Sequence, residues 1–258
     1  MTSSLSALCP RGSELRVFLI SLTLSLLERI SVVEHASDVF RAMQMDRVVL
    51  SFGDSLLRSS DVTLLDAPNW LNDNLIGFTF EFLASTLAPS TAEKIALLSP
   101  EVSQFIKCCG KDAPDFLHPL ALPEKDLILL PVNDNAGTQA GGTHWSLLAY
   151  FGGVREFLHY DSAPGTNTSH AQLMARNLTS MLGGNPRYQE EEAPSQHNSY
   201  DCGMYVVCVA QALCEQYFRG CNNLDLQNIT PQYVTQMRSE WKEIIRGLSS
   251  QSKATSGH

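Results

Sequence analysis

Apolar residues between positions 46 and 248 gather in runs whose length and spacing predict alternating helices and strands. Residues 75–83 form one such run and follow Asn72 and Asp73, two residue types that commonly cap helices, so they predict a buried helix. Ser99, Pro100 and Glu101 repeat this start signal with a capping hydroxyl, a proline in the first turn and a favourably placed carboxylate. A second helix is therefore expected to run from there to Cys108.

Shorter continuous apolar runs predict strands. Residues 127–132 form such a run and end at the polar stretch 133–135, as expected for a strand that is buried on both faces. Residues 144–151 and 154–161 flank Gly152 and Gly153, and this pattern predicts an antiparallel hairpin. Further helices are predicted after Thr168, over residues 202–218 and around Trp241. The mixture indicates an α+β fold.

The 258 residues suit one domain with additional terminal segments. We predict a domain over residues 45–248, an N-terminal extension over 1–44 and a disordered tail over 249–258. Residues 17–27 are apolar but shorter than the roughly 20 residues that a membrane span requires. Arg11 and Arg16 precede that run, so a secretory signal is an alternative to a loosely attached extension.

The composition limits the partners and the compartment. With 27 acidic and 18 basic side chains, the net charge of −9 repels nucleic acid and anionic membranes. The seven cysteines form no C-x-x-C pair, and a chain of this length needs no disulfides, so we expect reduced thiols inside the cell. Cys108, Cys109 and His118 are the best metal-ligand candidates, but adjacent cysteines rarely suit tetrahedral zinc, so we expect no metal.

The hairpin brings a histidine and an aspartate together. A turn centred between Gly152 and Gly153 places His144 directly opposite Asp161. Side chains of opposed residues are about 5 Å apart at Cβ, close enough for the carboxylate to accept a hydrogen bond from the imidazole. A one-residue bulge would send the two side chains to opposite faces, so the pairing depends on the register.

Cys202 is the candidate nucleophile because it begins the predicted helix 202–218, where the helix dipole stabilises a thiolate. Gly203 leaves space for a substrate, and Gln196 is positioned to stabilise an oxyanion through its side-chain amide. Each residue alone has a simpler structural explanation, and Cys208 and Cys214 are expected to be core thiols. The hypothesis of a His144, Asp161 and Cys202 triad rests on their conjunction.

Three segments carry a family resemblance: Gly-Thr-His-Trp-Ser at 142–146, His-Tyr-Asp-Ser at 159–162, and the stretch from Gln196 to Met204. With them the chain resembles the sentrin/SUMO-specific (ubiquitin-like) cysteine proteases, most of all their deneddylase branch. The resemblance extends from about residue 46 to residue 248. It implies a papain-like fold with a mixed or antiparallel sheet flanked by helices, and a mechanism without a cofactor.

The resemblance also implies a substrate site. Trp70 and Trp145 would form a narrow tunnel in which only glycine fits, and Asp73 would pair with an arginine of the substrate's tail. From the sequence alone, Asp73 could equally well cap its helix.

The expected function is hydrolysis after the C-terminal Gly-Gly of a ubiquitin-like modifier, above all the neddylation modifier, in precursors and in conjugates such as cullins. The alternatives are a SUMO-specific protease and a catalytically silent module that binds ubiquitin-like proteins. We expect a cytoplasmic or nuclear monomer that binds neither nucleic acid nor membranes.

Overall fold

The computed structural model describes residues 46–110, 116–219 and 226–255, and the described residues from Val48 onward form one compact unit. The predicted extension, with its apolar run, lies outside the described residues. In chain order the elements are β1 (Val48–Phe52), β2 (Ser55–Arg58), α2 (Ser59–Thr63), α3 (Asp73–Thr86), α4 (Pro89–Ala92), β3 (Ile95–Leu97), α5 (Pro100–Cys109), η2 (His118–Leu120), η3 (Leu122–Glu124), β4 (Leu127–Asn133), β5 (Trp145–Phe151), β6 (Glu156–Tyr160), α7 (Thr168–Leu182), β7 (Arg187–Glu191), α8 (Cys202–Arg219) and α9 (Pro231–Thr255).

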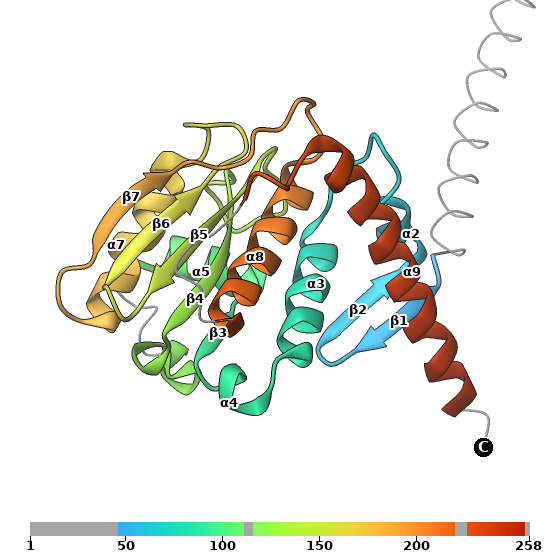
Figure 1. Cartoon of the computed structure of the whole chain (residues 1–258), viewed down its shortest axis with the longest axis horizontal. Helices are drawn as coiled ribbons and strands as arrows, with labels where there is room; N and C mark the ends of the chain where they lie inside the picture. The colour runs from blue at the N-terminus through green and yellow to red at the C-terminus, as the bar shows by residue number, and fades with distance from the viewer. Residues whose placement is uncertain (1–45, 111–115, 220–225, 256–258) are drawn as a thin grey trace, which may run out of the picture. The chain divides into compact units, whose positions relative to one another are not determined.

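The centre of the fold is a five-stranded mixed sheet with the order β3-β4-β5-β6-β7 (Figure 1). Strand β5 is antiparallel to both of its neighbours, β4 and β6. Strand β3 runs parallel to β4, and β7 runs parallel to β6. Strands β1 and β2 form a separate antiparallel hairpin. The predicted α+β class and the predicted mixed sheet flanked by helices are therefore confirmed.

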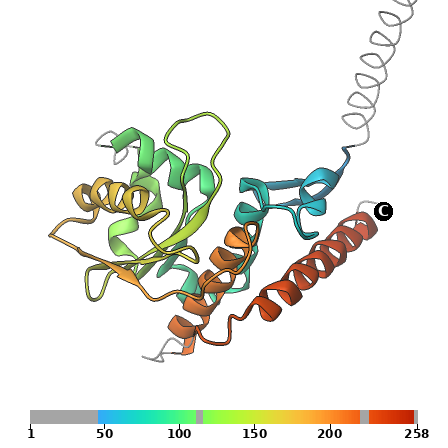
Figure 2. The same cartoon turned by 90° about the horizontal axis from the view of Figure 1, so that it is seen from above.

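Each face of the sheet carries its own hydrophobic core. Leu127 and Leu129 of β4 face the core shared with α3, α8 and α9, and the alternate residues Ile128 and Leu130 face the core shared with α5 and α7. Figure 2 shows the helices distributed to the two sides of the sheet. All seven residues of β4 are buried, which confirms the strand buried on both faces.

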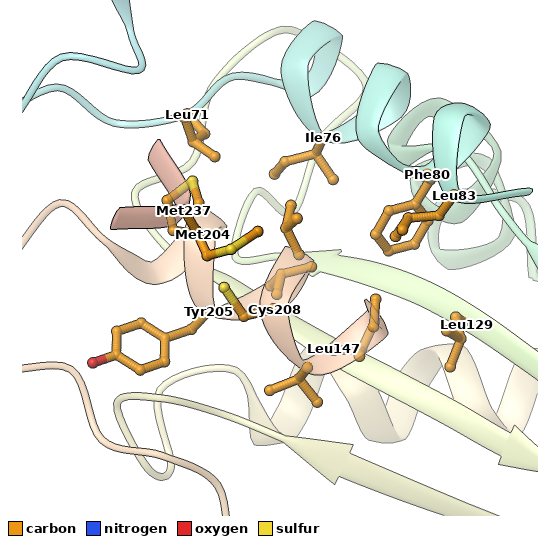
Figure 3. Close-up of a cluster of buried hydrophobic side chains, with 14 of the residues drawn as sticks. Leu71, Ile76, Phe80, Leu83, Leu129, Leu147, Met204, Tyr205, Cys208 and Met237 are labelled. Atoms are coloured by element: carbon orange, nitrogen blue, oxygen red, sulfur yellow. The ribbon is translucent and has the colours of Figure 1, made fainter. Parts of the chain in front are cut away.

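Helix α8 is the central helix of the larger core. In the close-up of Figure 3, its Met204 and Cys208 lie between Ile76 and Phe80 of α3 and Leu147 of the sheet. The helix places Cys202 at its first position, so the packing of its apolar side chains also fixes the location of that thiol.

The predicted helix starts are confirmed at both sites. The Asn72 side chain accepts a hydrogen bond from the Leu75 amide at 3.1 Å, and Ser99 accepts one from the Val102 amide at 3.3 Å. Each side chain satisfies one of the amide groups that a helix N-terminus leaves unpaired.

The predicted register of the β5–β6 hairpin is wrong by two residues. The turn comprises residues 152–155, with Arg155 at φ 52°, and Leu148 faces His159. Continuing this register places Ser146, and not His144, opposite Asp161. Because side chains alternate between faces with a period of two, a shift of two residues leaves every side chain on its predicted face.

The predicted disordered tail over 249–258 is wrong for residues 249–255, which continue α9. Buried residues recur along α9 at helical spacing, from Val234 through Trp241 and Ile245 to Ser249. Strand β7 was not predicted, because its acidic, mostly exposed residues give no apolar signal. Within the described residues no helix is long and apolar enough to cross a membrane.

Trp241 is 2% exposed, and its ring makes edge contacts with Phe78 and Phe82 at centroid distances of 6.1 and 5.5 Å. We expect Trp241→Ala to lower the free energy of unfolding by about 3–5 kcal/mol, because it leaves a cavity between α3 and α9. Urea denaturation measures this change. Leu173→Ala, at a position 37% exposed, is the control and should cost far less; equal losses would contradict the expectation.

Candidate active site

His144, Asp161 and Cys202 meet at one end of the sheet. His144 immediately precedes β5, Asp161 immediately follows β6, and Cys202 begins α8. The three residues are only 6%, 2% and 2% exposed. His144 Nε2 lies 2.6 Å from Asp161 Oδ1, so the predicted histidine–aspartate contact exists despite the changed register. The two residues are diagonal neighbours across the hairpin, a spacing that long side chains can still span.

The Asp161 carboxylate is held by backbone groups as well as by the imidazole. Its Oδ1 accepts a hydrogen bond from the Ala163 amide and its Oδ2 one from the Asn167 amide, each at 3.0 Å. Burial alone would raise the pKa of Asp161, but the hydrogen bonds from His144 and the two amides outweigh burial and lower it. Asp161 therefore stays ionised next to His144.

The opposite shift occurs at His144. Burial disfavours the imidazolium, but hydrogen bonds to Asp161 and Cys202 and the charges of both groups outweigh this effect and raise the pKa of His144 to about 9. This shift favours the imidazolium form of His144 at neutral pH, hydrogen-bonded to the Asp161 carboxylate. An adjacent imidazolium stabilises a thiolate, which is the nucleophilic form of cysteine.

The other two thiols of α8 lie in a different environment. Cys208 and Cys214 are buried, and burial raises the pKa of each to about 12, so both are unreactive thiols of the core. All cysteines of the described residues are free thiols. Among the five described cysteines, only Cys202 combines the helix N-terminus with the imidazole.

The amide of Gln196 has a defined orientation. Its Oε1 accepts a hydrogen bond from the Ser162 hydroxyl at 2.8 Å, and its Nε2 donates to the Asn198 carbonyl at 2.8 Å. The Gln196 backbone amide also donates to the Ser162 carbonyl at 2.9 Å. Because an amide nitrogen carries two N–H groups, one of them remains for an oxyanion.

Asn167 supports the pair and was missed in the sequence. It is completely buried, and its Nδ2 lies within hydrogen-bond distance of the Val132 carbonyl, the Ser146 hydroxyl and, at 3.4 Å, the His144 carbonyl. Together with its backbone bond to Asp161, the residue connects β4, β5 and the carboxylate. No local pattern marks such a residue, since its partners are distant in sequence.

Asp134 holds the segment that leads into β5. Its carboxylate accepts hydrogen bonds from the Thr143 amide and hydroxyl, each at 2.6 Å, and from the His144 amide at 3.1 Å. Burial opposes ionisation of Asp134, but these hydrogen bonds outweigh it and lower its pKa. The backbone of His144 is thereby fixed independently of its ring.

A second histidine in the sheet also has an acidic partner. His159 Nδ1 lies 2.7 Å from Glu190 of β7, and His159 Nε2 lies 2.8 Å from the Ser146 hydroxyl. Ser146 is 1% exposed within the sheet, so no substrate reaches this arrangement. It is a structural connection between β5, β6 and β7.

The residues predicted to bind substrate are Trp70, on the segment before α3, Asp73, the first residue of α3, and Trp145, the first residue of β5. Trp70 is 46% exposed, and the half-buried Trp145 donates from Nε1 to the Leu71 carbonyl at 3.2 Å. Asp73 is exposed. The helix-capping alternative for Asp73 is wrong, because Asn72 accepts the capping bond.

The metal candidates do not assemble a site in the described part of the chain. Cys108 and Cys109 end α5, and His118 lies in η2. Within residues 46–110, 116–219 and 226–255, no group of three or more His, Cys, Asp or Glu side chains could hold a metal ion.

A thiol at a helix N-terminus, beside a histidine–aspartate pair at one end of a mixed sheet, defines a cysteine protease of papain-like fold. Residues 69–246 match the family model described as "Ulp1 protease family, C-terminal catalytic domain". The chain therefore belongs to the Ulp1 protease family.

Relatives and solved structures agree with this assignment. Sentrin-specific protease 8 of Homo sapiens is 49% identical over 80% of this chain and 99% of its own length. NEDD8-specific protease 1 of Arabidopsis thaliana is 36% identical over 80% of this chain and 96% of its own length. The Ulp1 protease domain solved with Smt3, the yeast ortholog of SUMO, shares the fold with a TM-score of 0.63, at 17% identity over 79% of this chain and 89% of that one.

The His144 pKa gives a prediction about the histidine–aspartate pair. We expect its imidazole to titrate near pH 9, and to titrate at lower pH in Asp161→Asn, where the neutral amide no longer stabilises the imidazolium. Because the folded pKa exceeds the unfolded value of about 6.5, the stabilisation is complete below about pH 6.5 and is lost as the pH rises through 9. NMR of ¹⁵N-labelled histidine measures the titration; an unchanged His144 curve in Asp161→Asn would contradict the assignment.

Gly203 gives a prediction about the packing next to Cys202. A Cβ at this position would lie 2.9 Å from Leu71 Cβ and 3.3 Å from Leu71 Cγ, which is closer than packed side chains tolerate. We expect Gly203→Ala to push residue 71 and the neighbouring Trp70 away from Cys202 and to lower proteolytic activity at least about tenfold.

The matched control is Gly247→Ala on α9, where an added Cβ meets nothing within 4 Å. This change should retain full activity and stabilise the helix by about 0.5–1 kcal/mol. Equal activity of the two variants in a peptidase assay would show that Gly203 is not required for the approach of Leu71.

Proposed function

We propose that this protease hydrolyses the bond that follows the C-terminal Gly-Gly of a ubiquitin-like modifier, and that the neddylation modifier, NEDD8, is its principal substrate. The observation that carries the proposal is the buried contact of 2.6 Å between His144 and Asp161, beside a thiol at a helix N-terminus. The 49% identity to sentrin-specific protease 8 and the match to NEDD8-specific protease 1 support the choice of modifier.

The first step forms an acyl-enzyme. The Cys202 thiolate attacks the carbonyl carbon of the terminal glycine, and the C–N bond to the leaving amine breaks as the tetrahedral intermediate collapses. The His144 imidazolium donates its proton to that amine, which is a lysine side chain in a conjugate or an α-amine in a precursor. Asp161 keeps the ring oriented throughout.

The second step releases the modifier. The neutral imidazole of His144 takes a proton from water, the resulting hydroxide attacks the thioester, and the C–S bond breaks to leave a free carboxylate. Gln196 donates its remaining amide N–H to the oxyanion in both steps, next to the backbone amide of Cys202. The hydrogen bond from the Ser162 hydroxyl to Gln196 Oε1 supports this role. It fixes the orientation of the amide group and therefore the position of its donor nitrogen.

The tail of the modifier lies between Trp70 and Trp145. Two aromatic side chains at this entrance leave room only for residues without a side chain, which accounts for the preference for glycine. Asp73 is exposed in the first turn of α3 and is available to pair with an arginine of the tail.

The partners are the neddylation modifier and its conjugates, such as cullins. The net charge of −9 disfavours nucleic acid and anionic membranes. The free thiols of the described residues suit the reducing cytoplasm or nucleus, where we expect the protein to act as a monomer.

Cleavage of fluorogenic derivatives of NEDD8, SUMO and ubiquitin tests the proposal. We expect NEDD8 to be cleaved with the largest kcat/KM, and Cys202→Ala to abolish cleavage, because the variant lacks the thiolate that attacks the carbonyl carbon. The matched control is Cys208→Ala, which removes an unreactive thiol of the same helix and should retain kcat/KM.

Two results would contradict the proposal in different ways. Preferential cleavage of SUMO would identify a SUMO-specific protease. A wild-type protein that binds NEDD8 but cleaves none of the three substrates, and whose Cys202 does not react with a modifier bearing a C-terminal electrophile, would be a silent binding module.

A further inference from the structure

Arg238 is a buried charged residue of α9 that the proposed mechanism does not use. It is 3% exposed, and four of its five N–H groups have partners. Its Nε donates to Asp201 Oδ1 at 2.7 Å, Nη1 to the Leu64 carbonyl at 2.9 Å, and Nη2 to the Asn69 carbonyl at 3.0 Å and the Tyr200 carbonyl at 3.1 Å.

These partners belong to two segments that are distant in sequence. Leu64 and Asn69 belong to residues 64–71, which we call the tryptophan arm because they include Trp70. Tyr200 and Asp201 belong to residues 198–202, which we call the nucleophile turn because they end at Cys202. One guanidinium therefore bonds to the residue before Trp70 and to the residue before Cys202.

Further contacts hold each of the two segments in place. In the nucleophile turn, Asn198 Nδ2 donates to the second carboxylate oxygen of Asp201 at 2.7 Å, and the guanidinium lies 5.5 Å from the centre of the Tyr200 ring. In the tryptophan arm, the Leu71 carbonyl accepts the bond from Trp145. Leu71, the last residue of the tryptophan arm, packs directly on Gly203, which follows the nucleophile turn. The two segments therefore cannot move closer together.

We infer that Arg238 is a positioning residue for specificity: by bonding to both segments, it sets the distance between Trp70 and Cys202 and thereby restricts the tail to glycine. The inference rests on the proposed function and deepens it. Arginine suits this task because its planar guanidinium donates in several fixed directions at once, whereas the ammonium of lysine is a single point on a flexible stem. Arg238 itself does not touch the reacting atoms.

The test compares two fluorogenic NEDD8 substrates, one with the natural Gly-Gly tail and one in which the penultimate glycine is alanine. The measured quantity is the ratio of the two kcat/KM values, which does not depend on the fraction of active enzyme. In Arg238→Lys the pairing with Asp201 remains possible but the bonds to the arm are lost. We expect the Gly/Ala ratio to fall about tenfold relative to wild type, because the wider gap accepts a methyl group.

Trp241→Phe is the matched control, since it lies on the same helix, is buried and contacts α3 rather than the arm. It should lower the thermal midpoint and leave the ratio as in wild type. If Arg238→Lys does not fold, the double variant Arg238→Gln/Asp201→Asn takes its place, because it removes both buried charges together. We expect the same tenfold fall of the Gly/Ala ratio in this variant.

A ratio that stays at the wild-type value, whether or not activity falls, would overturn the inference and reduce Arg238 to a stabilising residue. A wild-type enzyme that cleaves NEDD8-Gly-Gly separates this failure from failure of the proposed function. Absence of that cleavage would overturn both.

Discussion

The hydrogen bond between His144 and Asp161 depends on an ionised carboxylate that is almost fully buried. Burial of a lone charge is unfavourable, so the fold must supply compensating donors, and here these are the imidazole and the backbone amides of Ala163 and Asn167. The loop after β6 has to fold back to present both amides. The path of the chain from β6 to α7 therefore includes the two backbone amides that the buried Asp161 carboxylate requires as hydrogen-bond donors.

The alternation of side chains along a strand explains why the predicted register, although wrong by two residues, still paired His144 with Asp161. The sequence pattern of the hairpin fixes which side chains share a face, since alternation is a property of every strand. It does not fix the length of the turn, because Arg155 adopts a positive φ that nothing in its side chain predicts. An error of two residues preserves the face, and the carboxylate reaches the imidazole diagonally.

The features that the sequence could reveal are those with local causes: the capped starts of α3 and α5, the buried strand β4, and the thiol at the start of α8. Residues such as Asn167 act through partners that are distant along the chain. Strand β7 likewise forms by pairing with β6, and its exposed acidic residues resemble a loop. No periodicity encodes these contacts, so they emerge only from the three-dimensional arrangement.

Arg238 makes contacts of this distant kind, and its burial with Asp201 requires the desolvation of two charges. Two charges removed from water rarely add stability compared with an apolar pair, so the ion pair with Asp201 is poorly explained as a device for stability alone. What an apolar pair could not supply is direction: three backbone carbonyls and one carboxylate are bound at fixed angles by a single planar group. That property suits the inferred role, in which the spacing of Trp70 and Cys202 decides whether a residue larger than glycine fits. In the role inferred for Arg238, the C-terminal helix α9 therefore contributes to the placement of Trp70 relative to Cys202, although Arg238 itself does not touch the reacting atoms.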